Sequence, residues 1–377
     1  MRFKILAVPF MRTVGESVVL AGRDRDRFQI MMHKLRDQMV MAEALGYDGF
    51  CLTEQHMQVE GVEATTNPLF WNLYIANHTT HFKVGQLGMN LTAMNPIKLA
   101  EDIAMLDHMT GGRMFAGFSR GNTPRWTVTM GQHLGLTSAE SDKSEADLRN
   151  RRALYENWRL LKSLWRDDLT RHDGEFWKVP PSIDWTFNPT TDWGGDAVDG
   201  HGKLRKIGIT PRPLQDPHPP IYAPFSYSME SARFWAGEGT KMVSLVTADK
   251  ESFMPAIIEN CLQARQEKGL EAKANDVLAL GGHLLMGTTP ERRGIYRQMF
   301  FEIFNYAYNA PPYHVPMGRV WNGSRQETLD NVMMLAERYQ IDEFFLWHHV
   351  GYFGDDYEQE SLIEFAEGVI QEVNKTV

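Results

Sequence analysis

The segment KVGQLGMNLTAMNPIKLAEDIAMLDHMTGGRMFAGFS (residues 83–119) decides the fold class of this chain. It begins with the apolar run 83–90, which is typical of a buried strand, and Pro96 then stands at the start of a helix. A glycine pair turns the chain into a second apolar run, 113–119. A strand, a helix and a strand in this order predict two parallel strands that are joined by a helical crossover.

The same alternation of strand and helix patterns continues towards both ends of the chain. Short apolar runs alternate with segments that have the 3.6-residue spacing of an amphipathic helix. The predicted strands are 3–10, 47–53, 83–90, 113–119, 220–225, 241–246, 276–286 and 341–347, and the predicted helices are 27–45, 68–80, 96–108, 144–165, 229–238, 251–268, 326–339 and 358–373.

Eight strand–helix units predict an α/β fold in which the sheet closes into a (β/α)8 TIM barrel. The alternative, a doubly wound open sheet, needs a GxGxxG turn after the first strand, and PFMRTVGES (9–17) does not supply one. Two insertions interrupt the alternation: 168–218 follows the fourth helix, and the aromatic-rich 287–322 follows the seventh strand. We therefore expect one barrel domain over 1–377 with these two excursions.

The composition narrows the class of protein. The chain has 377 residues and a net charge of −9, without a run of Lys or Arg, which disfavours nucleic acid and anionic membranes as partners. No window has the ~20 apolar residues of a membrane span, and residues 1–10 lack the features of a secretory signal. Two cysteines exclude a disulfide scaffold and a cysteine-rich metal cluster. We expect a cytoplasmic enzyme without a metal.

Polar residues follow several predicted strands, at the end of the barrel where active sites lie. Glu54, Gln55 and His56 follow the strand 47–53. Glu54 and His56 are two apart on an extended segment and so point the same way. We expect His56 to act as a hydrogen-bond donor or general acid–base, with Glu54 orienting it. The alternative for each residue is a hydrogen-bonded position on the rim.

A second group of residues predicts an anion site. Arg120 follows the strand 113–119, and Arg152 lies early in the helix 144–165. Ser228 and Ser231 stand at the start of the helix 229–238, where free N–H groups and the helix dipole favour phosphate. The alternative is that Ser228 only caps the helix. His348 and His349, after the strand 341–347, lack the spacing of metal ligands.

Several motifs resemble the bacterial-luciferase-like flavin-dependent monooxygenases, and the similarity extends over nearly the whole chain. The family has the (β/α)8 fold, which agrees with the strand count. Similar segments also include the end of the second strand and part of the last helix. The motifs that carry the resemblance are NPIKLAEDIAMLDHM (95–109), GGR (111–113), GFSRG (117–121), PRPLQDPHPPI (211–221) and LIEFAEGVI (362–370).

The resemblance implies a two-component enzyme. Its members use FMNH2 from a separate NAD(P)H:flavin reductase, form a C4a-(hydro)peroxyflavin with O2, and oxygenate an organic substrate. By motif, the phosphate of FMN would be held by Arg120, Arg152, Ser228 and Ser231, with Tyr227 adjacent. Leu87, Gly88 and Asn90 would line the isoalloxazine ring, Ser119 would also belong to the cofactor site, and Glu54, Gln55 and His56 would be catalytic.

The resemblance also makes structural predictions. Luciferases have a non-proline cis peptide at the place that matches Leu87–Gly88. Gln55 replaces a luciferase histidine and Ser119 a reactive cysteine, so light emission from an aldehyde is disfavoured. The segment 287–322, with Phe300, Phe301, Phe304, Tyr306, Tyr308 and Tyr313, is interpreted as a mobile lid that excludes water, or alternatively as packed core.

The leading functional hypothesis is an FMNH2-dependent monooxygenase for a bulky, largely apolar or aromatic small molecule. The substrate class rests on the high content of Met and aromatic residues. One alternative is an F420-dependent oxidoreductase of the same superfamily, and another is a non-catalytic FMN-binding protein. A homodimer is expected from the apolar cluster Phe70, Trp71, Leu73, Tyr74 and Ile75 in the helix 68–80.

Overall fold

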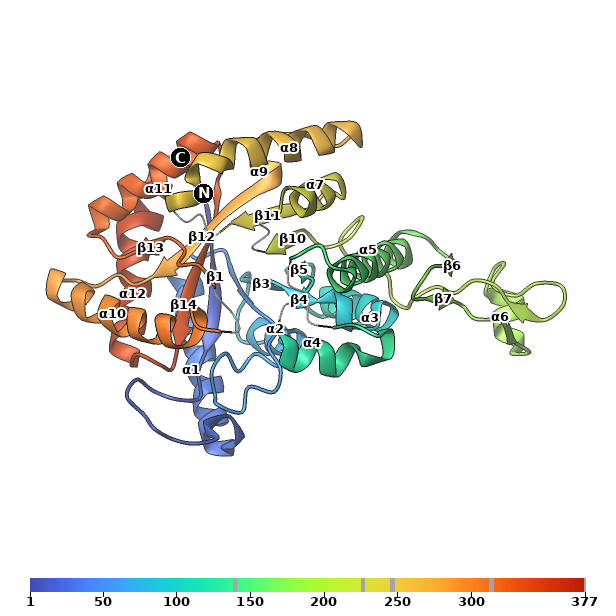
Figure 1. Ribbon diagram of the computed structural model, residues 1–377, viewed down its shortest axis with the longest axis horizontal. Coiled ribbons are helices and arrows are strands. Elements are labelled where there is room, and N and C mark those ends of the chain that lie inside the picture. Colours follow the sequence, from blue (N-terminus) through green and yellow to red (C-terminus); the bar gives the residue numbers. More distant parts are fainter. Residues whose placement is uncertain (122, 138–140, 225–227, 245–247, 312–314, 376–377) are drawn as a thin grey trace. The chain divides into compact units, whose positions relative to one another are not determined.

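Eight strands form a closed parallel barrel in the computed structural model (Figure 1), which confirms the predicted (β/α)8 fold. The barrel closes because β10 pairs with β5 as well as with β11. The structure describes residues 1–121, 123–137, 141–224, 228–244, 248–311 and 315–375. The barrel strands are β1 (Arg2–Pro9), β2 (Gly49–Leu52), β3 (Lys83–Gln86), β5 (Met114–Ser119), β10 (Ile221–Pro224), β11 (Lys241–Ser244), β12 (Leu278–Leu284) and β14 (Glu343–Val350).

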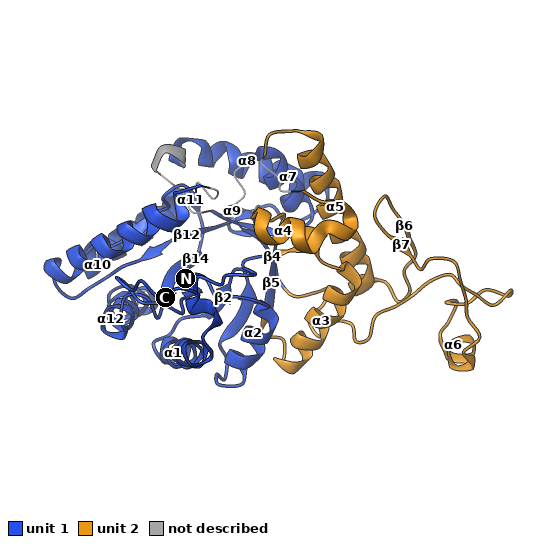
Figure 2. Cartoon of the chain, turned by 60° about the horizontal axis from the view of Figure 1, so that its bottom comes forward, with its two compact units in different colours: residues 1–89, 115–118, 220–377 blue, residues 90–114, 119–219 orange. Residues whose placement is uncertain are grey.

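The chain divides into two compact units (Figure 2). Unit 1 comprises residues 1–89, 115–118 and 220–377, and it contains the barrel. Unit 2 comprises residues 90–114 and 119–219. A single domain over the whole chain therefore stays a prediction.

The helices of unit 1 connect its strands. Their starts carry the expected signals, since Asp24 caps α1 through its side chain and Ser324 forms a capping box with Glu327. The elements are η1 (Ala21–Arg23), α1 (Arg25–Ala44), α2 (Pro68–Ala76), α7 (Met229–Gly237), η4 (Ala248–Phe253), α8 (Met254–Glu267), α9 (Ala274–Val277), α10 (Pro290–Ile303), η5 (Phe304–Tyr308), β13 (Val320–Trp321), α11 (Arg325–Tyr339), α12 (Asp355–Phe365), η6 (Ala366–Ile370) and α13 (Gln371–Lys375).

The segment 287–322 is more regular than expected for an excursion. Thr289 caps α10, and the π-helical turn η5 continues it. Phe300 and Phe304 are buried in a cluster of aromatic and aliphatic side chains, whereas Tyr306 is 82% exposed. The packed-core alternative therefore describes Phe300 and Phe304. Tyr313 lies outside the described residues.

Unit 2 is built on a helical pair with two small sheets. α3 packs against α5, and the Trp165 indole N–H donates to the Ala100 carbonyl at 3.0 Å. The predicted excursion 168–218 contains the antiparallel strand pairs β6–β7 and β8–β9 and the helix α6, which has no buried residue. The elements are β4 (Met89–Asn90, which begins in unit 1), η2 (Leu91–Ala93), α3 (Pro96–Met109), α4 (Pro124–Gly131), η3 (Gln132–Leu134), α5 (Glu145–Arg166), β6 (His172–Asp173), β7 (Lys178–Val179), β8 (Ile183–Asp184), α6 (Asn188–Trp193) and β9 (Lys203–Leu204).

Alternation along the strands sorts side chains between the inside of the barrel and its outer helices. On β14, Phe345 and Trp347 join the inner cluster, whereas Phe344 and Leu346 pack with helix residues outside it. No helix in the described part of the chain has the length and apolar character to cross a membrane.

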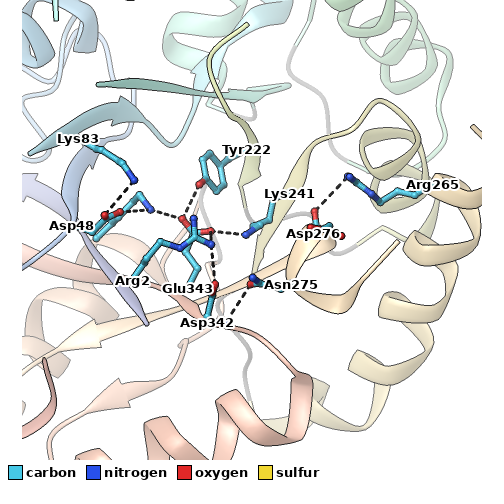
Figure 3. A network of polar contacts seen from close by, with 11 residues as sticks. Arg2, Asp48, Lys83, Tyr222, Lys241, Arg265, Asn275, Asp276, Asp342 and Glu343 are labelled. Carbon is cyan, nitrogen blue, oxygen red and sulfur yellow. Dashed lines mark hydrogen bonds and ion pairs between the residues drawn. The ribbon is translucent and has the colours of Figure 1, made fainter. Parts of the chain in front are cut away.

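A charged layer occupies the amino end of the barrel (Figure 3). The buried Glu343 carboxylate accepts hydrogen bonds from Lys4 and, at 2.7 Å each, from the Lys241 ammonium and the Tyr222 hydroxyl. Asp48 also pairs with Lys4, at 2.9 Å. The cations Lys4 and Lys241 lower the pKa of Glu343 to about 2 despite its burial. This end of a barrel usually serves stability, whereas active sites lie at the opposite, carboxyl end.

Candidate active site

The residues after β2 supply the carboxylate and the imidazole that the sequence predicts. Glu54 is buried, and its Oε1 lies 3.1 Å from Nε2 of His56, whose side chain is 14% exposed. The predicted contact between Glu54 and His56 is therefore present. A carboxylate held against an imidazole fixes the orientation and tautomer of the ring. The acid–base role of His56 stays a prediction.

Gln55 lies beside an acidic residue that the sequence analysis did not single out. The Glu63 carboxylate interacts with the side chains of Gln55 and Tyr308, and it accepts from the Thr53 hydroxyl at 3.4 Å. Burial raises the pKa of Glu63. The loop that carries Glu63 has no periodic pattern, and no sequence signal marks this residue.

The end of β3 carries the cis peptide that the resemblance predicts, since the Leu87–Gly88 bond is cis. Leu87 is buried in the inner cluster of the barrel. A Cβ atom on Gly88 would lie 2.8 Å from the Gly117 backbone and 2.9 Å from Pro224 Cγ. Glycine is required here because backbone approaches backbone closely.

Asn90, the last residue of β4, belongs to unit 2 and is fully buried. Its Nδ2 donates to the Thr127 hydroxyl of α4 at 3.1 Å. Gly121 has a φ of +74°, and a Cβ there would overlap the Asn90 side chain. This packing holds Asn90 in one orientation, while its contact with flavin stays a prediction.

Arg120 begins a charged cluster within unit 2. It is ion-paired with Asp147 of α5, and its guanidinium donates to the Ser141 hydroxyl at 2.8 Å. Arg151 pairs with the same carboxylate at 3.3 Å. Burial, together with the nearby Arg151 charge, lowers the pKa of Arg120 to about 10. Two guanidinium groups thus share one carboxylate. Ser119, one residue before, is half-buried at the end of β5.

Arg152 lies apart from that cluster. Its side chain is exposed and pairs with Glu145 at 3.0 Å and with Glu175 at 2.9 Å. The hydrogen bonds that Arg152 donates to these carboxylates raise its pKa. The structure therefore brings Arg151, one position earlier on α5, next to Arg120, and the phosphate role of Arg152 stays a prediction.

The serines before and within α7 form a helix cap. The Ser228 hydroxyl accepts from the backbone N–H of Ser231 at 3.4 Å, so the capping alternative describes this structure. Tyr227 lies outside the described residues. Phosphate binding by Ser228 and Ser231 stays a prediction.

The two histidines at the end of β14 point in opposite directions. His348 faces α1, where its Nε2 lies 2.7 Å from the Gln38 side-chain oxygen. His349 faces inward, among the rings of Phe10, Phe300 and Phe353. In the described part of the chain, no three His, Cys, Asp or Glu side chains converge as metal ligands.

The chain is similar in sequence and in fold to known proteins. The model of the family described as "Luciferase-like monooxygenase" matches residues 17–330. The chain belongs to this family. The resemblance stated from the sequence motifs is thereby confirmed.

Two relatives of this luciferase-like protein carry informative names. One is the oxygenase component of the flavin-dependent trigonelline monooxygenase of Acinetobacter baylyi, 28% identical over 41% of this chain and 33% of that protein. The other is the F420-dependent glucose-6-phosphate dehydrogenase of Kineococcus radiotolerans, 26% identical over 39% of this chain and 41% of that protein. The first three curated relatives are matched over 59%, 33% and 41% of their own lengths.

Solved structures show the same fold over the whole luciferase-like chain. The monooxygenase RslO1 from Streptomyces bottropensis has a TM-score of 0.70 and 16% identity, covering 99% of this chain and 100% of that one. The oxygenating constituent of 3,6-diketocamphane monooxygenase from Pseudomonas putida, solved with FMN, has a TM-score of 0.63 and 17% identity, covering 96% and 99%.

Proposed function

We propose that this protein is an FMNH2-dependent monooxygenase that oxygenates a bulky, largely apolar or aromatic molecule. The observation that carries the proposal is the Glu54–His56 pair, held at 3.1 Å after β2. Both residues lie in unit 1. A proton-transferring group thus stands at the carboxyl end of a barrel strand, where the active sites of this fold lie.

The flavin, when bound, would supply the electrons and the reaction with O2. The protein would hold the ring and control protons. Because a carboxylate oxygen only accepts hydrogen bonds, His56 Nε2 carries the hydrogen in its contact with Glu54, and Nδ1 of the neutral ring is the basic nitrogen. His56 would therefore take or return a proton at Nδ1. The buried Glu54 would stabilise the imidazolium that forms.

Phosphate recognition is proposed for Arg120. Arg120 and Arg151 both pair with Asp147, and the Asp142 carboxylate also lies near Arg120. This arrangement orients the Arg120 guanidinium, whose five N–H groups allow it to donate to a phosphate as well as to Asp147. Arg152, Tyr227, Ser228 and Ser231 remain further candidates from the resemblance.

The proposed partners follow from the family. A relative named as an oxygenase component supports a separate flavin reductase that supplies FMNH2. A homodimer through α2 is supported by Phe70, which is 72% exposed, whereas Trp71 and Ile75 pack inside the protein. A cytoplasmic location remains a proposal.

The decisive experiment follows the reoxidation of reduced flavin by stopped-flow absorbance. The protein is mixed with FMNH2 without oxygen and then with oxygenated buffer. We expect FMNH2 to reoxidise more slowly with the protein than free in solution. His56→Gln should keep FMNH2 affinity but change this rate, whereas His81→Gln, at a side chain that is 77% exposed, should leave it unchanged. A reoxidation rate equal to that of free FMNH2 contradicts the proposal.

One alternative is an F420-dependent oxidoreductase, which the Kineococcus relative favours. Titration with FMN and F420 under identical conditions separates the two, since the F420 enzyme binds the deazaflavin and needs no O2. The other alternative, a non-catalytic FMN-binding protein, would bind FMN but show no flavin-dependent consumption of an organic substrate.

A further inference from the structure

The carboxyl end of the barrel interior holds two histidines that face each other, His283 of β12 and His349 of β14. Inward-facing positions recur at every second residue, so His283 lies on the side of Ala279 and His349 on the side of Phe345 and Trp347. Each histidine is 1% exposed. Their rings are nearly parallel, with an interplanar angle of 16° and a centroid separation of 6.2 Å.

Aromatic rings enclose both histidines. The rings nearest His283, besides that of His349, belong to Trp347 at 4.5 Å, Phe300 at 4.7 Å and Phe304 at 5.6 Å. The rings nearest His349 belong to Phe353 at 5.3 Å, Phe300 at 5.5 Å and Phe10 at 5.8 Å. None of these neighbouring rings carries a charge that could balance an ion.

Inside this aromatic shell three of the four imidazole nitrogens lack a hydrogen-bond partner among the described residues. Neither ring nitrogen of His283, nor Nδ1 of His349, has a hydrogen-bond partner among the residues that the structure describes. Burial lowers the pKa of both histidines, that of His349 to about 3, so both are neutral at pH 7. A neutral imidazole offers one N–H and one lone pair, and a buried polar group of this kind is normally satisfied.

The pair lies near the candidate active site within unit 1. Phe304, which contacts His283, stacks on Tyr308 at 5.7 Å, and Tyr308 interacts with Glu63 beside Gln55. Trp347 belongs to the same inner cluster as Leu87 and is 9% exposed. The histidine pair is thus connected through side-chain contacts to the ends of β2 and β3.

We propose that His283 and His349 bind a neutral oxygen atom, a hydroxyl or a carbonyl, on an aromatic substrate of this enzyme. The inference rests on the proposed monooxygenase function, because that function makes the bound molecule a substrate. The aromatic shell suits a flat ring through stacked and edge-on contacts, and the two imidazoles supply the hydrogen bonds that orient it. A carboxylate fits less well because the imidazoles are neutral and no cation touches them among the ring contacts.

The test uses two probes of equal shape, p-cresol and p-xylene, which differ by a hydroxyl in place of a methyl group. Their binding to the flavin-free protein is measured by isothermal titration calorimetry at pH 7. We expect p-cresol to bind about tenfold more tightly, which corresponds to 1.4 kcal/mol. His283→Phe and His349→Phe should each reduce this preference at least threefold and leave p-xylene binding intact. p-Toluate, the carboxylate analogue, should bind more weakly than p-cresol.

Tyr296→Phe is the matched control. Tyr296 is buried in the neighbouring aromatic cluster, and its hydroxyl also lacks a partner among the described residues. Its ring contacts the rings of Phe353 and Tyr357. This variant should keep the preference for p-cresol. Loss of the preference in Tyr296→Phe alone would assign the oxygen to Tyr296 and overturn the proposal.

A second measurement covers the case in which a histidine variant fails to fold. The imidazole ¹⁵N resonances of the wild-type protein should shift when p-cresol is added and remain unchanged with p-xylene. Equal affinity for the two probes, no binding of either, or unchanged resonances would overturn the proposal. Because no flavin is present, a protein that fails the FMNH2 test and still prefers p-cresol loses the proposed function and keeps the histidine site.

Discussion

Replacing His349 with Phe should make the protein less sensitive to mild acid. In the folded chain, burial holds the pKa of His349 at about 3, against an ordinary value of 6.5. Between these two pH values the unfolded chain binds a proton that the folded chain does not. The stabilising contribution is therefore fully present above pH 6.5 and is lost as the pH falls towards 3.

The magnitude follows from the unfolded state, because the folded pKa lies well below the pH range of the experiment. From a pKa of 6.5, protonation of an unfolded histidine removes about 2 kcal/mol of stability between pH 7 and pH 5. Burial lowers the pKa of His348 to about 3 as well, so the same loss applies there. Two such losses are a large part of the roughly 5–15 kcal/mol that stabilise a typical domain.

The assay is urea unfolding, followed by tryptophan fluorescence, at pH 7 and pH 5 for the wild type and His349→Phe. Comparing the two proteins cancels groups that act oppositely, such as Glu63 and Glu358, whose pKa values are raised by burial. We expect the wild type to lose about 2 kcal/mol more than the variant. A difference below about 0.5 kcal/mol would refute the assignment of His349 as a neutral buried group in the folded chain.

Three further predictions concern other parts of the chain. Glu343→Gln should cost about 3–5 kcal/mol in urea unfolding because buried Lys4 loses a carboxylate, and adding Lys4→Met should recover part of that loss; no recovery would contradict this account. Arg120→Ala should weaken FMN binding in equilibrium titration by about 1–3 kcal/mol, with exposed Arg166→Ala as the control, and equal affinities would remove Arg120 from the phosphate site. Phe70→Ser should convert a dimer into a monomer in light scattering, and a monomeric wild type would exclude the dimer.

The positions of the helices and strands were largely predictable because local patterns produce them. Apolar runs such as 3–10 and 341–347 alternate with helix-spaced segments, and closure needs only eight repeats. The helix α10 lies inside the predicted excursion 287–322, although Tyr296, Phe300, Ile303 and Phe304 have helical spacing and Thr289 provides a cap. The aromatic composition of that segment favoured a lid and concealed the periodicity.

The candidate site was predictable only where neighbours in sequence are also neighbours in space. Glu54 and His56 meet because residues two apart on an extended chain share a side. Arg151 rather than Arg152 joins Arg120 because successive helical residues point about 100° apart, and the phase of α5 depends on which face is buried.

The sequence by itself determined the barrel, the family and the polar ends of the strands, since these depend on periodicity and on contiguous motifs. The tertiary structure alone decided which distant residues meet. It placed Glu63 beside Gln55, and it set His283 against His349, which are far apart along the chain. Their inward positions follow from strand alternation, but their lack of partners depends on every side chain packed around them, and no local pattern encodes that packing.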